Sequence, residues 1–358
     1  MRIWFPLISI VCLSLCINSK SHAQHTLMQM QWPKTDFSKT TVDLSSIHSG
    51  GLPRDGIPAI DNPGFEKARD VTNLSDKEPV IQIVINGRAK AYPIQILMWH
   101  EIVNDRIGDI PVVVTYCPMC NTSVALRRDV TVDGRKRLLD FGVTGKLRHS
   151  DLIMYDRQTE SWWQQFSGDA IAGDFAGSRL EVISSRVVPF AEFKTVYPDG
   201  NVLKVTENMD RPYGINPYAG YDLAETPMLF TGATTPAPIK PMEYLVAVGR
   251  EAWPLVRLRQ EGRILHNDLI LTWYEGMNSA LGARKIKEGR DIGFVQVQRK
   301  TIEGDLKDTP HLVTFAFAFH AFEPDGIVYF DKNKRTVPAE KSTCTPDILM
   351  EEIEDLQK

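Results

Sequence analysis

Two cysteines in one short stretch are the residues of this sequence best suited to chemistry. Cys117 and Cys120 have the spacing Cys-x-x-Cys, and Pro118 between them stiffens the chain. This spacing lets both sulfurs face one point, as a disulfide, as a redox pair or as two ligands of one metal ion. A thiolate pair suits copper(I) or zinc, so copper or zinc is the cofactor we expect.

The further ligands that either metal needs are expected among nearby histidine and acidic residues. His100 is the best candidate for the third ligand and Glu101 for the fourth, with His149 or Asp151 behind them. We therefore predict the two cysteines and His100 as metal ligands. We predict the same cysteines and Asp151 as catalytic residues, because a carboxyl group at such a site can act in proton transfer.

Two aromatic residues are candidates for contacting a bound ligand. Trp163 and Tyr155 follow Asp151 in the sequence, and aromatic rings bury a large area while presenting a polar edge. Core packing is the competing role for at least one tryptophan of this stretch. The chain has no second histidine at zinc-protease spacing, no phosphate-binding glycine loop and no nucleophile elbow, which excludes those enzyme classes.

Three functional interpretations remain open for the cysteine pair. The first is a metal-binding protein. The second is a thiol–disulfide oxidoreductase, although thioredoxin-like sites place the first cysteine at a helix N-terminus and this pair lies between predicted strands. The third is a non-catalytic binding module whose cysteines form a structural disulfide.

The elements that must position the cysteines are two predicted strands. Residues 112–115 and 124–126 are apolar runs on either side of the pair. Upstream, residues 80–85 and 88–92 flank Asn86-Gly87, a strong hairpin pattern. Pro93 then begins a predicted helix, whose apolar residues run to Ile102 at helical spacing.

The second half of the chain repeats features of the first. Residues 249–255 resemble 87–94, residues 272–279 align with 115–122, and residues 325–329 resemble 151–155. In this alignment Tyr274 and Met277 replace the cysteines, and Arg263 falls near His100. We therefore predict a β-rich α+β fold with two related units in one compact body, and we place the chemistry in the first unit.

The repeat and the composition divide the chain into six predicted segments. These are a signal peptide (1–23), an irregular arm that wraps the core (24–78), the first unit (79–206), a proline-rich connecting loop (207–242), the second, degenerate unit (243–335) and a tail (336–358).

The N-terminus predicts export. Arg2, an apolar run over residues 8–17 and a small-x-small cleavage site ending at Ala23 form a signal-peptide pattern. A lipoprotein signal at Cys16 is excluded because Leu15 precedes it. The expected location is therefore periplasmic or extracellular.

Of the five cysteines, Cys344 and the central pair remain after cleavage, too few for a disulfide scaffold. The net charge is −4 with no basic run, so nucleic acid and membrane insertion are poor expectations. A small ligand or metal ion is the expected partner.

From residue 80 to about 202 the chain resembles the bacterial family catalogued as domain of unknown function 3179. The resemblance implies a shared fold and no specific activity. Asn121 stands where a glycine is common in that family, and His149 where an asparagine is common, which weakens His149 as a shared catalytic residue. The stretches that carry the resemblance are 91–93, 99–105, 116–120, 141–147, 150–152, 154–159 and 170–173, with 217–221 beyond them.

Overall fold

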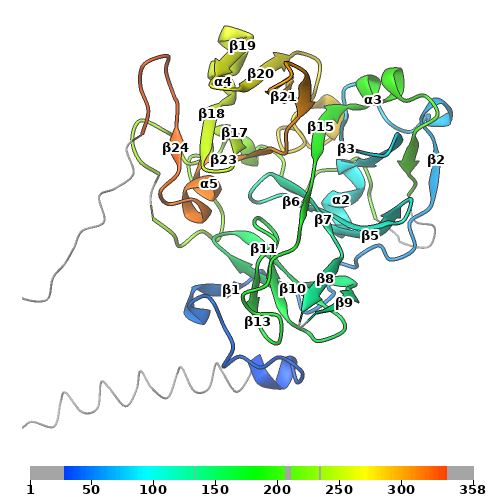
Figure 1. Cartoon of the computed structure of the whole chain (residues 1–358), viewed down its shortest axis with the longest axis vertical. Coiled ribbons are helices and arrows are strands. Elements are labelled where there is room, and N and C mark those ends of the chain that lie inside the picture. Colours follow the sequence, from blue (N-terminus) through cyan, green and yellow to red (C-terminus); the bar gives the residue numbers. More distant parts are fainter. Residues whose placement is uncertain (1–27, 133, 206–210, 234, 337–358) are drawn as a thin grey trace, which may run out of the picture.

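The computed structural model describes residues 28–132, 134–205, 211–233 and 235–336 (Figure 1). The predicted signal peptide and Cys344 lie outside these ranges. Within them, no helix is both long and apolar enough to cross a membrane.

The predicted hairpin at Asn86-Gly87 is confirmed. Strand β3 (Pro79–Ile85) pairs antiparallel with β4 (Arg88–Pro93). Asn86 and Gly87 have φ of 49° and 75°, the left-handed values that a two-residue type I′ turn needs. The sheet built on this hairpin has the order β15-β3-β4-β16-β2, with β15 (Ser185–Pro189), β16 (Asn201–Leu203) and β2 (Phe65–Lys67).

The helix predicted after Pro93 is shorter than expected. Helix α2 (Ile94–His100) ends where Glu101 adopts φ 57° and ψ −30°. A left-handed residue reverses the chain direction at a helix end, so residue 102 already belongs to the next strand. The helix buries an apolar face made by Ile94, Ile96, Leu97 and Met98.

The cysteine turn joins the two central strands of a second sheet. This sheet has the order β14-β7-β6-β5, and the turn over residues 118–121 links β6 to β7. Val112, Val113 and Val114 of β6 are fully buried, as expected for a strand covered on both faces. The strands are β5 (Ile102–Ile107), β6 (Ile110–Cys117), β7 (Thr122–Arg127) and β14 (Val182–Ile183).

The second half repeats this order of elements, which confirms the two related units. Its first sheet, β23-β17-β18-β24, matches β15-β3-β4-β16, and in both sheets the last-named strand pairs parallel with the hairpin. A seven-residue helix follows each hairpin. The elements are β17 (Tyr244–Val248), β18 (Glu251–Pro254), α4 (Leu255–Glu261), β19 (Arg263–His266), β20 (Leu269–Tyr274), β21 (Phe294–Lys300), β22 (Leu306–Asp308), β23 (Leu312–Phe315), α5 (Ala316–Phe322) and β24 (Ile327–Val328).

Two equivalent polar pairs show how the units diverged. Lys90 Nζ contacts Asp105 Oδ2 at 2.7 Å in the first unit, and Glu251 Oε1 contacts His266 Nε2 at 3.1 Å in the second. Strand register makes Lys90 of the first unit equivalent to Glu251 of the second, and Asp105 equivalent to His266. The acidic residue therefore lies on the strand after the helix in the first unit and on the hairpin strand before the helix in the second, and both units keep the contact between these strands.

Some details of the predicted repeat are wrong. Residues 325–329 match 199–203 and not 151–155. A Cβ at Gly200 would meet the Phe193 ring at 2.7 Å, and a Cβ at Gly326 would meet the Phe319 ring at the same distance. Residues of α3 (Phe190–Val196) and α5 precede these glycines in the same way. His100 ends α2 where Glu261, and not Arg263, ends α4.

The alignment of residues 272–279 with 115–122 holds only as far as Tyr274, which takes the place of Cys117. Tyr274 pairs with Phe294 as Cys117 pairs with Thr122. The connection between β20 and β21 is therefore much longer than the cysteine turn, and Met277 is not in an equivalent turn.

The first unit also carries an insertion that supplies the rest of the site. Among the described strands, the second unit has no counterpart of the sheet β1-β10-β11-β12-β13 or of the ribbon β8-β9. The arm from residue 28 packs on this insertion, where Trp32 and Trp162 share a small core. The strands are β1 (Ile47–Ser49), β8 (Asp129–Val132), β9 (Arg135–Leu138), β10 (Phe141–Arg148), β11 (Asp151–Asp156), β12 (Trp162–Gln164) and β13 (Ala170–Ala172).

Short 3-10 helices lie in the arm, the connecting loop and the second unit. They are η1 (Leu44–Ser46), η2 (Ala68–Asp70), η3 (Tyr221–Leu223) and η4 (Ile286–Glu288).

Candidate functional site

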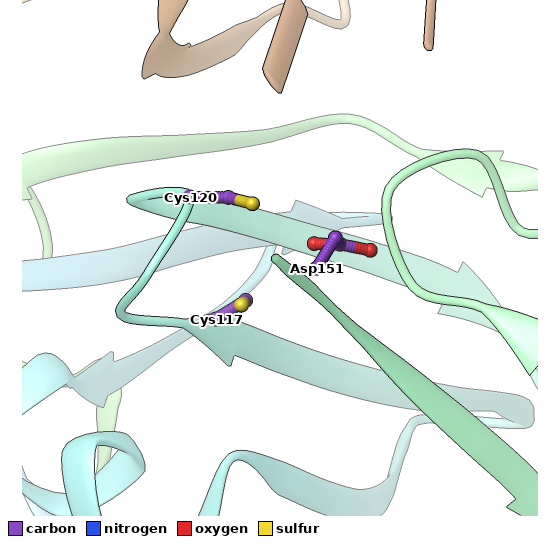
Figure 2. A group of neighbouring side chains, drawn as sticks. All are labelled: Cys117, Cys120 and Asp151. Atoms are coloured by element: carbon purple, nitrogen blue, oxygen red, sulfur yellow. The ribbon is translucent and has the colours of Figure 1, made fainter. Parts of the chain in front are cut away.

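Cys117, Cys120 and Asp151 converge at one point (Figure 2). One ligand atom from each residue lies within 4.8 Å of the other two, and all three residues are buried. Cys117 ends β6, Cys120 follows in the turn, and Asp151 begins β11 of the inserted sheet. Among the described residues this is the group of histidine, cysteine and acidic side chains arranged to hold a metal ion.

Both thiols are free and face the turn between β10 and β11. Cys117 Sγ donates to Ser150 O at 3.6 Å, and Cys120 Sγ donates to His149 O at 3.8 Å. His149 and Ser150 have φ of 52° and 62°, a conformation that costs non-glycine residues energy and that clusters at functional sites. This turn therefore aims two carbonyl groups at the two sulfurs.

The carboxyl group of Asp151 is held by one of its oxygens. Oδ2 accepts hydrogen bonds from Gln164 Nε2 at 2.7 Å and from the Phe166 backbone N at 3.0 Å. Oδ1 is buried and has no hydrogen-bond partner among the described residues. A buried oxygen without a partner is costly, so this atom is available to a ligand.

Burial makes every acid of the site hard to ionise. It raises the pKa of Asp151 to about 7, although the bonds from Gln164 and Phe166 lower it. Burial also raises the pKa of the Cys117 thiol, and raises that of Cys120 further, with Cys117 beside it as a smaller cause. The charged forms of these groups need a cation to compensate them.

Glu101 is a fourth acidic residue of the same environment. Burial raises the pKa of Glu101 to about 8, and the nearby Asp151 carboxyl adds to the effect. Cys117 and Tyr218 are its other electrostatic neighbours. The Glu101 side chain is 8 % exposed and makes no hydrogen bond or ion pair with any described residue, although its oxygens are not among the fully buried atoms left without a partner. The site is therefore a buried group of acids.

His100 is placed outside the converging group. Its Nδ1–H donates to Pro58 O at 2.7 Å, and its Nε2 accepts from the Tyr213 hydroxyl at 2.7 Å. Burial lowers the pKa of the ring, which agrees with a neutral imidazole that uses both nitrogens. The structure does not bring this predicted ligand together with the cysteines.

The two predicted ligand-contacting aromatics also lie elsewhere. Trp163 is fully buried and its Nε1–H donates to Asp156 Oδ2 at 3.0 Å. Tyr155 packs against Trp32 in the small core below the inserted sheet. Both rings have packing roles in this structure.

A segment of the connecting loop covers the site, and we call residues 211–233 the cover segment. Tyr221 donates to Met119 O at 3.1 Å, within the cysteine turn. Ser150 Oγ donates to Met228 O at 2.6 Å, and the Phe230 ring packs on His149. With the Tyr213–His100 bond, the cover segment contacts both turns of the site and the end of α2.

The second unit fixes the cysteine turn from the other side. Cys120 O accepts from Thr314 Oγ1 at 3.0 Å and from the Phe315 backbone N at 3.1 Å. Thr314 also shares a hydrogen bond of 2.9 Å with Thr122 Oγ1. The unit without cysteines thus serves as a support for the unit that carries them.

Sequence reasoning did not assign roles to Gln164 and Tyr221, which position Asp151 and the cysteine turn. Gln164 is buried with its amide on a carboxylate, which a sequence cannot reveal. Tyr221 lies in the stretch 217–221, whose family resemblance was the only sequence indication that this loop matters.

The comparisons with known proteins identify a family whose function is unknown. A family model described as Protein of unknown function (DUF3179) matches residues 54–326 and so spans the first unit with its insertion and most of the second unit. No curated protein and no solved structure matches the chain. Because the match covers most of the sequence, the chain belongs to this family of proteins of unknown function.

Proposed function

We propose that this is an exported protein that binds one metal ion, zinc or copper(I), through Cys117, Cys120 and Asp151. The observation that carries the proposal is the convergence of two thiols and a carboxyl group within 4.8 Å in a fully buried position. Zinc takes cysteine and carboxylate ligands together, whereas copper(I) is selected by thiolates alone.

Electrostatics favours a metal over an empty group of acids. Two thiols and two carboxyls share one buried environment, and burial opposes ionisation of each. A divalent cation reverses this situation, because a coordinated thiol loses its proton. Asp151 Oδ1, which has no protein partner among the described residues, gains one when a metal binds.

The experiment is a titration of reduced, metal-free mature protein with zinc and, separately, with copper(I), in competition with a chromogenic chelator. We expect one equivalent of metal per chain. Cys117→Ser and Cys120→Ser should abolish that binding, and Cys344→Ser, the matched control thiol outside the described residues, should retain it. Absence of binding to the wild-type protein overturns the proposal.

A thiol–disulfide oxidoreductase is the second candidate, favoured by the free state of both thiols beside a carboxyl group with a pKa of about 7. In that reaction one sulfur attacks a partner disulfide and the other resolves the mixed disulfide. The protein then holds a disulfide and the partner two thiols, with Asp151 accepting the proton of the attacking thiol.

Burial ranks this candidate second. Reactive cysteines are partly exposed and have lowered pKa values, whereas both thiols here are buried and have raised ones. A redox titration of metal-free protein separates the two candidates, because an oxidoreductase should exchange reversibly near the potential of its compartment.

A further inference from the structure

We infer that Glu101 is the fourth ligand of the metal, so that the site is a centre of two cysteines and two carboxylates that selects zinc over copper(I). This inference rests on the proposed metal site and names its metal. A structural zinc site takes four protein ligands in a tetrahedron, and the converging group supplies three.

The first argument concerns the other two nearby donors, of which one is already engaged. Both ring nitrogens of His100 are occupied, by Pro58 O and the Tyr213 hydroxyl. His149 turns its backbone carbonyl toward Cys120, and its ring packs against Phe230 and Phe322. Its Nδ1 is buried without a hydrogen-bond partner among the described residues, so His149 is the competing donor that the test below must separate from Glu101.

Glu101 has the neighbours that a ligand should have. Its backbone O accepts a hydrogen bond of 2.9 Å from Tyr116 N, the residue that precedes Cys117, and its carboxyl group has Asp151 and Cys117 as electrostatic neighbours. It is 8 % exposed and has no hydrogen bond or ion pair to any described side chain. A buried carboxyl without a protein partner is the kind of group that a cation recruits.

The backbone of Glu101 supplies an independent argument. Glu101 has φ 57° and ψ −30°, and its counterpart after α4 is Gly262, with φ 69° and ψ −40°. Their equivalence is shown by matching bonds, in which Glu101 O accepts from Tyr116 N at 2.9 Å and Gly262 O accepts from Trp273 N at 2.8 Å. The second unit, which lacks the cysteines, has glycine at this position, the residue that fits a positive φ. The first unit, which carries the cysteines, keeps a strained glutamate there.

The glutamate must move to complete the site. Its carboxyl oxygens do not belong to the group within 4.8 Å, so coordination requires rotation about its side-chain bonds. Because no hydrogen bond to a described residue holds the carboxyl in place, the rotation breaks none. Zinc draws the side chain in, whereas copper(I) is satisfied by the two thiolates.

The test compares zinc and copper(I) affinities of the reduced mature protein and of Glu101→Gln. We expect zinc affinity to fall roughly 10- to 100-fold, as is typical when support for a metal site is lost, and copper(I) affinity to stay unchanged. Glu78→Gln is the matched control, because Glu78 is also a buried carboxyl with an unpartnered oxygen, but its neighbours are Ser75 and Lys287 and not the converging group. It should leave both affinities unchanged.

The coordination itself is read from the cobalt(II)-substituted protein. Loss of a ligand in Glu101→Gln should shift its visible ligand-field bands, whereas loss of a distant charge should not. Glu101→Gly should raise the melting temperature of the metal-free protein, because glycine fits the left-handed backbone, while lowering zinc affinity as Glu101→Gln does.

The outcomes separate this inference from the proposed function. Equal zinc affinity of Glu101→Gln and the wild type overturns the fourth ligand but leaves the three-residue metal site standing. A loss of zinc affinity in His149→Asn, with Glu101→Gln unaffected, assigns the ligand to the histidine instead. No binding of either metal to the wild type overturns both.

Discussion

Gln164 Nε2 donates a hydrogen bond of 2.7 Å to Asp151 Oδ2, and both side chains are buried. This contact joins β12 to the start of β11 and fixes the plane of the carboxyl group. One oxygen is thereby fixed by the protein, and the other, Oδ1, remains available at the point where the two sulfurs converge.

Gln164→Leu should weaken metal binding without unfolding the protein. The apolar side chain fills a similar volume but removes one of the two hydrogen bonds that orient the carboxyl group. Removal of a residue that orients a ligand typically costs about 10-fold or more in metal affinity. The measurement is the zinc competition titration beside a thermal melt. Unchanged affinity contradicts the positioning role.

The metal-free protein should become less stable as the pH rises. The folded-state pKa values of Asp151 and Glu101, about 7 and about 8, lie above their ordinary values of 3.8 and 4.5. The folded state therefore binds more protons, and the stabilising contribution, complete below about pH 4, is lost as pH rises through 7 and 8.

We expect the free energy of unfolding of the metal-free protein to be lower at pH 9 than at pH 5 by about 6 kcal/mol through these two groups. Denaturant titrations of the wild type and of the double variant Asp151→Asn/Glu101→Gln provide the check. The variant should show a smaller difference between the two pH values, and an equal difference contradicts the assignment. Zinc affinity should change in the opposite direction, rising with pH, because binding displaces protons from the thiols.

Loss of a cysteine should affect metal binding more than folding. In Cys120→Ser the hydroxyl can still donate to His149 O, so the reduced, metal-free protein should lose less than about 1 kcal/mol. Tyr92→Ala should cost about 3 kcal/mol or more, because Tyr92 is fully buried and donates to Asp105 Oδ2 at 2.6 Å. Thermal melts of both metal-free variants test this. If Cys120→Ser destabilises as much as Tyr92→Ala, the cysteine is structural.

The exchanged polar pair offers a test of the repeat. Lys90→Glu places a second carboxyl beside the buried Asp105, and breaking such a pair costs about 3–5 kcal/mol. The double variant Lys90→Glu/Asp105→His recreates the Glu251–His266 contact of the second unit. It should recover part of the loss, which a double-mutant cycle measures. Additive losses contradict the equivalence of the two pairs.

The sequence predicted the local parts of this structure better than the way they meet. The Asn86-Gly87 hairpin, the cysteine turn between strands and the two β-rich units depend on short-range patterns, and the structure confirms them. The convergence of Asp151 with the cysteines depends on how the inserted sheet packs on the first unit. No local pattern encodes that packing.

The sequence favoured His100 over Glu101 as a metal ligand, whereas the structure places Glu101 nearer the cysteine site. The backbone explains this difference. His100 and Glu101 are adjacent in sequence, but the left-handed backbone at Glu101 ends the helix between them. His100 consequently bonds to Pro58 and Tyr213, while Glu101 has Asp151 and Cys117 as neighbours. The helix pattern continued to Ile102 in the sequence, and it gave no indication of this reversal.

X-ray absorption at the zinc edge of the metal-loaded, reduced protein tests the central claim most directly. The proposed centre predicts a shell of two sulfur atoms at about 2.3 Å and two oxygen atoms at about 2.0–2.2 Å. A spectrum with no sulfur neighbours, or with imidazole nitrogens in place of the carboxylate oxygens, would contradict the account.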